Sequence, residues 1–179
     1  MDVFEIKVTL QDIRPFIWRR IQVPVDIRFG KFHRVLQAVM GWTNSHLHAF
    51  RIGDMTYGVP HPDSPDLAQS GRVIPLDKVA GPGDAFLYEY DFGDGWMHEI
   101  KVEKALPADP AAHYPRCLTG ERACPPEDCG GPPGYEDLLA VLRDPAHPEH
   151  EEIREWVGPR YDPEAFDPDE VNRLLWRLH

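Results

Sequence analysis

The chain has 179 residues, 42% of them hydrophobic, which is enough for one domain built around one core. No apolar run approaches the ~20 residues of a membrane-spanning helix. The N-terminal residues lack the basic and apolar blocks of a signal peptide. We therefore expect a single cytoplasmic domain over residues 1–179, with no membrane association.

Acidic residues are concentrated in one part of the chain. Residues 105–170 hold 16 acidic and 5 basic residues, and the net charge of the whole chain is −11. Because an acidic segment repels a phosphate backbone, the composition argues against direct nucleic-acid binding. The segment is instead a candidate docking surface for a basic protein partner. Near the N-terminus Arg14, Arg19 and Arg20 form a small basic cluster, which we interpret as solvent-facing strand residues.

The first 104 residues are predicted to be rich in strands. Apolar and polar residues alternate over residues 4–10, which is typical of a half-buried strand. A second extended stretch over 17–23 follows the break at Arg14-Pro15. The two stretches are therefore expected to form an antiparallel hairpin with a loose connection.

One helix and a third strand are predicted next. Apolar residues recur at helical spacing over 32–40, and Gly41 is placed to end that helix. From His46 onward the chain is again expected to be extended, which places His46 and His48 on one face of a strand. The stretch 53–83 is predicted to be mostly loop because of its many prolines.

The clearest hairpin is predicted near the middle of the chain, where two stretches of alternating aromatic and apolar residues flank a glycine-rich turn. A three-residue turn, Gly93-Asp94-Gly95, pairs Phe92 with Trp96 and keeps every apolar side chain on one face, which a two-residue turn does not. The same register pairs Tyr90 with His98. It places His98 on the buried side.

The C-terminal part is predicted to be helical. Residues 105–133 show no periodicity and are expected to form an irregular connector. Helical stretches follow within 134–179, and Asp167 or Asp169 caps the last of them. Because strands come first and helices later, we expect an α+β domain. Its sheet, mixed or antiparallel with about five strands, surrounds one helix and is followed by a helical C-terminal portion.

All three cysteines lie in the connector. With a histidine they give the spacing His113-x3-Cys117-x6-Cys124-x4-Cys129. Three thiols and an imidazole suit tetrahedral zinc, but only the last gap comes near the spacing usual between paired zinc ligands. The alternative is that the cysteines are small buried residues that pack a turn.

Histidines and carboxylates form a second group of candidate site residues. We interpret His98 as a core histidine that neighbouring polar groups satisfy. The alternative joins it to His46 and His48 in a His/carboxylate cluster for a divalent metal or for acid–base chemistry. The carboxylates available to such a cluster are Asp91, Asp94, Glu127 and Asp128.

The segment Pro125–Gly131 is rigid at its start and flexible at its end. Either Glu127 or Asp128 accepts backbone N–H groups and so anchors the connector, or the segment binds a ligand. The sequence has no G-x-S-x-G, no Walker loop and no His-Glu-x-x-His. The sequence therefore contains none of these familiar catalytic motifs and indicates no class of enzyme.

The order of these segments resembles that of the plasmid ORF-3-like family, which is named for an open reading frame on a root-inducing plasmid. The matching segments are Pro15–Arg20, Met40–Trp42, Asn44–Phe50, Tyr90–His98, Cys124–Gly131, Gly134-Tyr135 and His147–His150. The resemblance implies an α+β domain of unknown biochemical function. Some members are labelled transposon resolvase or insertion-element passenger protein, which implies an association with mobile elements. This chain lacks the nucleophilic serine among arginines that a serine resolvase needs, so the resemblance supplies no catalytic residue.

Three functional hypotheses follow. The leading one is a non-enzymatic module that binds a ligand or a protein. The first alternative is a metal-dependent, hydrolase-like enzyme that uses the His/carboxylate cluster, and the second is a structural zinc domain built on the cysteines. The candidate cofactor is a divalent metal ion, zinc first. The residues expected at the pocket are His46, His48, Tyr90, Asp91, Asp94, Trp96, His98, Glu127 and Asp128.

Overall fold

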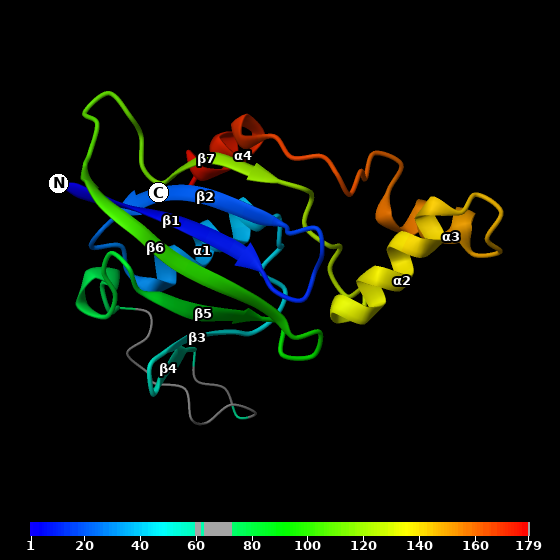
Figure 1. The fold of residues 1–179 in the computed structure, drawn as a ribbon, viewed down its shortest axis with the longest axis horizontal. Helices are drawn as coiled ribbons and strands as arrows, with labels where there is room; N and C mark the ends of the chain where they lie inside the picture. The colour runs from blue at the N-terminus through cyan, green and yellow to red at the C-terminus, as the bar shows by residue number, and fades with distance from the viewer. Residues whose placement is uncertain (60–61, 63–72, 179) are drawn as a thin grey trace.

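The structure, a computed structural model, describes residues 1–59, 62 and 73–178. These residues form an α+β fold on one antiparallel sheet of seven strands, in the spatial order β4-β3-β5-β6-β1-β2-β7 (Figure 1). The strands are β1 (Asp2–Leu10), β2 (Trp18–Pro24), β3 (His48–Ile52), β4 (Met55–Gly58), β5 (Ala85–Tyr90), β6 (Trp96–Pro107) and β7 (Arg116–Glu121). The helices are α1 (Phe29–Met40), α2 (Gly131–Arg143), α3 (His150–Val157) and α4 (Pro168–Leu175), and a short 3-10 turn spans Leu76–Lys78.

The core lies between α1 and one face of the sheet. Phe29 and Phe32 of α1 contact Phe50 of β3, with ring centroids 4.6 and 5.8 Å apart. Ile6 of β1 is fully buried, and burying such a side chain contributes roughly 1.5–3 kcal/mol. The helix ends at Gly41, whose φ of +105° suits glycine. The predicted helix and its end are therefore confirmed.

The sheet has two more strands than the sequence predicts, and both lie at its edges. β4 falls within 53–83, where the sequence predicts loop, and β7 falls within 105–133, where it predicts an irregular connector. β7 lacks a regular apolar alternation, and it forms because the free edge of β2 pairs with it. Of the loop predicted over 53–83, residues 60–61 and 63–72 lie outside the described part of the chain.

The hairpin of β5 and β6 has a longer turn than predicted. Tyr90 pairs with Trp96 instead of His98, and Phe92 lies in the turn. The turn starts at Asp91, which takes a left-handed φ of +58° and accepts a hydrogen bond from the N–H of Gly95. This register differs from the predicted one by two residues, which leaves every side chain on its face. His98 is therefore on the buried side, as predicted.

The C-terminal helices lie in two places. α2 and α3 form a helical hairpin that projects beyond one end of the sheet, whereas α4 returns to pack beside α1 and β7 (Figure 1). Asp167 caps α4 by accepting a hydrogen bond from the N–H of Asp169 at 2.8 Å, as predicted. Asn172 of α4 bonds to both the N–H and the carbonyl of Cys117 on β7. None of the described helices has the length and apolarity to cross a membrane.

Arg19 is buried, although the sequence predicts that it faces solvent. Only 1% of the residue is exposed. Its Nε donates to the carbonyl of Val39 at 2.7 Å, and its Nη1 donates to the carbonyl of Glu121 at 2.9 Å. Its guanidinium lies 3.8 Å from the ring centroid of Phe166. Burial lowers the pKa of Arg19 to about 10. The residue fastens the C-terminal end of α1 to β7 and is not part of an exposed basic patch.

Candidate metal centre

Three loops meet at one end of the sheet. They are the loop between α1 and β3, the β5–β6 turn, and the segment between β7 and α2. His46 comes from the first loop, Asp91 from the second and Glu127 from the third. Side chains from distant parts of the chain therefore share one small volume.

Three potential ligand atoms converge between these loops. His46 Nε2 lies 3.6 Å from Asp91 Oδ2 and 4.0 Å from Glu127 Oε2, and the three residues each place a ligand atom within 4.8 Å of the other two. Asp128 Oδ1, on a more exposed side chain, is 2.7 Å from the same nitrogen. In the part of the chain that the structure describes, no other group of three or more His, Cys, Asp or Glu side chains comes together in this way.

Two of these atoms are buried without a hydrogen bond to any described residue. They are His46 Nε2 and Glu127 Oε2. The contact of 2.7 Å between His46 Nε2 and Asp128 Oδ1 does not count as a hydrogen bond, because it lacks hydrogen-bond geometry. An unsatisfied buried polar atom costs roughly 1–3 kcal/mol. A bound cation would remove that cost for both atoms at once.

Asp91 presents one carboxylate oxygen to the cluster and uses the other for its own turn. Its Oδ1 accepts hydrogen bonds from the N–H groups of Gly93 at 3.0 Å and Asp94 at 3.3 Å. Asp tolerates the left-handed backbone that this turn requires. Because Oδ1 is held by the turn, Oδ2 is fixed toward His46.

The two carboxylate oxygens of Glu127 also have different roles. Its Oε1 accepts hydrogen bonds from the N–H and the hydroxyl of Thr43, at 2.7 and 3.0 Å, and from the Tyr90 hydroxyl at 3.0 Å. Burial raises the pKa of Tyr90, so this phenol stays protonated and can donate. The N–H of Ser45 in turn donates to the Tyr90 hydroxyl at 2.9 Å. Thr43 and Ser45 support the site, but no pattern in the sequence marks two small polar residues in a loop.

Asp94 and the two glycines at the N-terminal end of α2, Gly130 and Gly131, hold two of the loops together. Asp94 Oδ2 accepts a hydrogen bond from the N–H of Gly130 at 3.1 Å. At Gly131 the backbone has a φ of +70°, and a Cβ there would clash with the carbonyl oxygen of Asp94. Asp94 is therefore a positioning residue that brings the segment carrying Glu127 against the hairpin turn.

Two of the residues predicted for the pocket lie in the core instead. Trp96 and His98 are fully buried. Trp42 Nε1 donates to His98 Nε2 at 3.2 Å, so Nδ1 carries the proton and donates to the carbonyl of Tyr88 at 3.1 Å. Burial lowers the pKa of His98 to about 4. His98 is a neutral core histidine with both nitrogens used.

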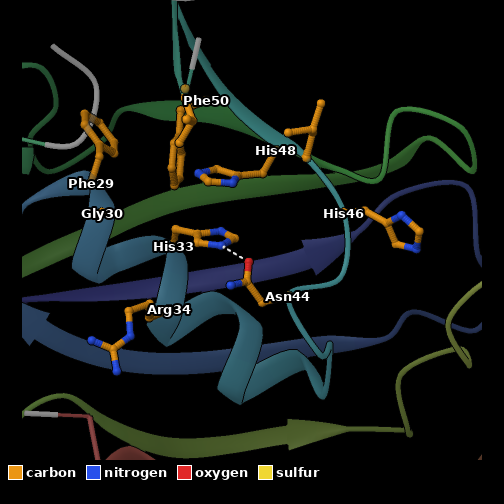
Figure 2. Close-up of a pocket in the computed structure, with 11 residues that line it drawn as sticks. Phe29, Gly30, His33, Arg34, Asn44, His46, His48 and Phe50 are labelled. Carbon is orange, nitrogen blue, oxygen red and sulfur yellow. Dashed lines mark hydrogen bonds between the residues drawn. The ribbon is translucent and has the colours of Figure 1, made fainter. Parts of the chain in front are cut away.

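His46 and His48 do not share one face of a strand, because β3 begins only at His48, although both line the same cavity. The His48 ring stacks on His33 of α1, with centroids 3.5 Å apart. Both line a cavity of about 380 Å³ with Asn44, whose Oδ1 is 2.7 Å from His33 Nε2. Figure 2 shows His46 on the other side of the chain from this stacked pair. The prediction that His46 and His48 lie on one face of a strand is therefore wrong. His33 was not predicted as a site residue, because it lies among the apolar residues of a predicted helix.

The cysteines are not assembled with His113. The only cluster of ligand atoms among the described residues excludes all four. The His113 ring packs on Trp176, with centroids 4.8 Å apart. Burial raises the pKa of Cys117 to about 11 and that of Cys129 to about 12, and it also raises the pKa of Cys124 well above its usual value. Protonated thiols on one buried and two half-buried cysteines are the arrangement expected of packing residues.

The geometry of the cluster is close to that of a metal site. Zinc binds histidine nitrogen and carboxylate oxygen at about 2.0–2.2 Å, which puts neighbouring ligand atoms roughly 3–3.5 Å apart. The distances of 3.6 and 4.0 Å from His46 Nε2 are slightly wider. One imidazole and two carboxylates suit Zn²⁺, Mn²⁺ or Fe²⁺ better than Ca²⁺ or Mg²⁺, which favour oxygen ligands alone.

The fold and the cluster define a class, an antiparallel α+β protein with histidine and carboxylates gathered at the end of its sheet. The chain belongs to the family described as plasmid pRiA4b ORF-3-like protein, which matches residues 2–170. It is 44% identical over 176 residues to the uncharacterized protein y4hQ of Sinorhizobium fredii, covering 97% of this chain and 90% of that protein. The crystal structure of the protein of unknown function MM3350 from Methanosarcina mazei Go1 is similar, with a TM-score of 0.84 and 38% identity over 95% of this chain and 97% of the other. The predicted family is confirmed, and neither relative is named for an activity.

Proposed function

We propose that this protein binds a divalent transition-metal ion through His46, Asp91 and Glu127 and uses it in hydrolytic chemistry. The observation that carries the proposal is the pair of buried, unsatisfied atoms, His46 Nε2 and Glu127 Oε2, which face Asp91 Oδ2. The remaining oxygens of the two carboxylates already hold hydrogen bonds, so three ligand atoms are pre-oriented toward one point.

Three protein ligands leave coordination positions for water or substrate, which is the pattern of catalytic rather than structural zinc sites. A metal ion in such a site polarises a carbonyl or phosphoryl oxygen and lowers the pKa of bound water. Asp128, with a 67% exposed side chain, stands beside the centre. It is placed to accept a proton there.

The first test is metal content and affinity. We expect about one equivalent of Zn²⁺ or Mn²⁺ per chain by elemental analysis and titration calorimetry. Glu127→Gln should remove most of this binding, whereas the control Glu136→Gln, at an exposed helix position outside the cluster, should retain it. Absence of metal above background in the folded protein would refute the proposal.

The second test is turnover. The metal-loaded protein should hydrolyse p-nitrophenyl esters or bis-p-nitrophenyl phosphate, and chelation or Glu127→Gln should abolish this activity. Stoichiometric metal without turnover would favour the second candidate function, a non-enzymatic binding module. A groove beside Asp128 favours that candidate independently of the metal.

A further inference from the structure

Figure 1 shows α2 and α3 as a helical hairpin that projects from the sheet. Residues of both helices, together with Asp128 and Cys129, line a groove. Its volume is about 500 Å³, and Leu138, Val141 and Ile153 give it an apolar lining. Trp156 also lines it and is 52% exposed. A large aromatic side chain left exposed beside an apolar groove is typical of an interaction surface.

The same groove has an acidic rim. Four carboxylate residues line it, and among the described lining residues there is no lysine or arginine. The four are Asp128, Asp137, Glu149 and Glu152. Arg154 of α3 does not compensate them, because its guanidinium donates to the carbonyls of Tyr161 and Pro159 at 3.0 and 3.2 Å.

We propose that this groove binds a basic segment of a partner protein. Lysine or arginine side chains of the segment would pair with the rim, and an apolar side chain would enter the groove against Ile153. The exposed face of Trp156 attracts a guanidinium or ammonium group as well. A basic segment is therefore the ligand whose charge is complementary to the groove, because acidic side chains surround its apolar lining.

A second copy of this chain fits the groove less well. The chain has a net charge of −11. Of the basic residues near its N-terminus, Arg19 is 1% exposed, and Arg20 forms an ion pair with Glu103 at 2.7 Å. Two copies would each present the acidic helical hairpin, and their net negative charges would repel each other.

This proposal does not require the metal centre, although the two sites meet. Asp128 lines the groove and also lies 2.7 Å from His46 Nε2. A segment bound in the groove would consequently end beside the histidine–carboxylate cluster. Binding measured with and without chelator separates the two proposals, since the groove should bind its segment in either condition.

The test uses a fluorescein-labelled flexible peptide of lysine, leucine and glycine residues, titrated with the full chain by fluorescence anisotropy. We expect micromolar affinity at about 50 mM salt and roughly tenfold weaker binding at about 300 mM, because exposed charges are screened. The matched peptide with glutamate in place of lysine should not bind. The peptide with glycine in place of leucine should bind more weakly.

Variants of the groove locate the binding. Glu149→Gln combined with Glu152→Gln should weaken peptide binding about fivefold, since two exposed ion pairs are lost. The control, Glu136→Gln combined with Glu155→Gln, removes the same charge from the α2–α3 hairpin outside the groove. Trp156→Ala should weaken binding at least as much, whereas Trp176→Ala, at another tryptophan that is 61% exposed, should not.

Three results would overturn the proposal. One is absence of binding to the lysine peptide at low salt. Another is equal loss in the groove and control variants, which would assign the binding to overall charge. The third is a concentration-dependent dimer in light scattering that Trp156→Ala abolishes, because the occupant would then be a second copy of the chain.

Discussion

Two buried histidine nitrogens differ in their hydrogen bonding, one in the core and one at the end of the sheet. In the core, His98 receives a hydrogen bond from Trp42 and gives one to the carbonyl of Tyr88, so neither nitrogen has capacity left. At the end of the sheet, His46 Nε2 is buried and has no hydrogen bond to a described residue, while carboxylate oxygens of Asp91, Glu127 and Asp128 lie 2.7–4.0 Å from it. Burial alone therefore does not mark a functional histidine. We propose that a buried ring nitrogen without a hydrogen-bond partner, facing several carboxylates, does.

Removing the side chain of His46 is the strongest test of the difference between the two histidines. We expect His46→Ala to weaken Zn²⁺ binding by about a thousandfold or more, equivalent to about 4 kcal/mol, because one of three protein ligands is lost. Titration calorimetry against a competing chelator measures this. His147→Ala, at a histidine outside the cluster, and Cys129→Ser, in the cysteine group, should bind metal as the unaltered chain does. Loss of metal binding only in Cys129→Ser would instead assign the metal site to the cysteines.

The contact between the hairpin turn and the N-terminal end of α2 gives the next largest effect. Gly131→Ala places a Cβ against the carbonyl of Asp94 at a backbone φ of +70°. We expect a loss of about 3 kcal/mol in the free energy of unfolding, together with weaker metal binding. Urea denaturation of the metal-free protein measures the stability. Gly53→Ala also lies at positive φ, but its Cβ would meet nothing within 4 Å, so it isolates the backbone contribution from the clash.

The satisfied histidine predicts a pH effect without metal. Burial lowers the pKa of His98 to about 4 in the folded chain, whereas the unfolded value is about 6.5. Between these values the unfolded state binds more protons, so stability is full above about pH 6.5 and falls as the pH drops toward 4. From about pH 7 to pH 5 the loss from this group should be about 2 kcal/mol.

Urea denaturation with chelator present at both pH values checks this effect. His98→Phe should lower stability at neutral pH, because the Trp42 indole N–H loses its acceptor, but it should reduce the pH dependence. The prediction fails if the dependence is the same with and without His98.

Tyr90 connects the two regions and gives the smallest effect. Its ring is buried in the core while its hydroxyl donates to Glu127. Tyr90→Phe should weaken metal binding about tenfold, the usual cost of losing a group that orients a ligand. Stability should fall by about 1 kcal/mol. Calorimetry compares this variant with Tyr57→Phe, a buried tyrosine elsewhere in the core. Equal metal affinity in both variants would show that Thr43 alone is enough to orient Glu127.

Much of the fold was predictable because the relevant interactions are local. Alternating apolar residues identified β1, β2, β5 and β6, and helical spacing identified α1 and its end at Gly41. The family followed from motifs along nearly the whole chain. The edge strands β4 and β7 were missed because neither has a pattern of its own, and each exists by pairing with a neighbour.

For the site, the sequence determined which residues were candidates, since His46, Asp91, Glu127 and Asp128 were all named among them. It could not decide which of three histidines joins the carboxylates. That choice depends on where β3 begins, on the five-residue turn that Asp91 starts, and on the clamp between Asp94 and Gly130. These are contacts between residues far apart in the chain. Composition and spacing describe neighbours along the sequence, whereas ligand convergence depends on the packing of separate loops, so only the tertiary structure decided it.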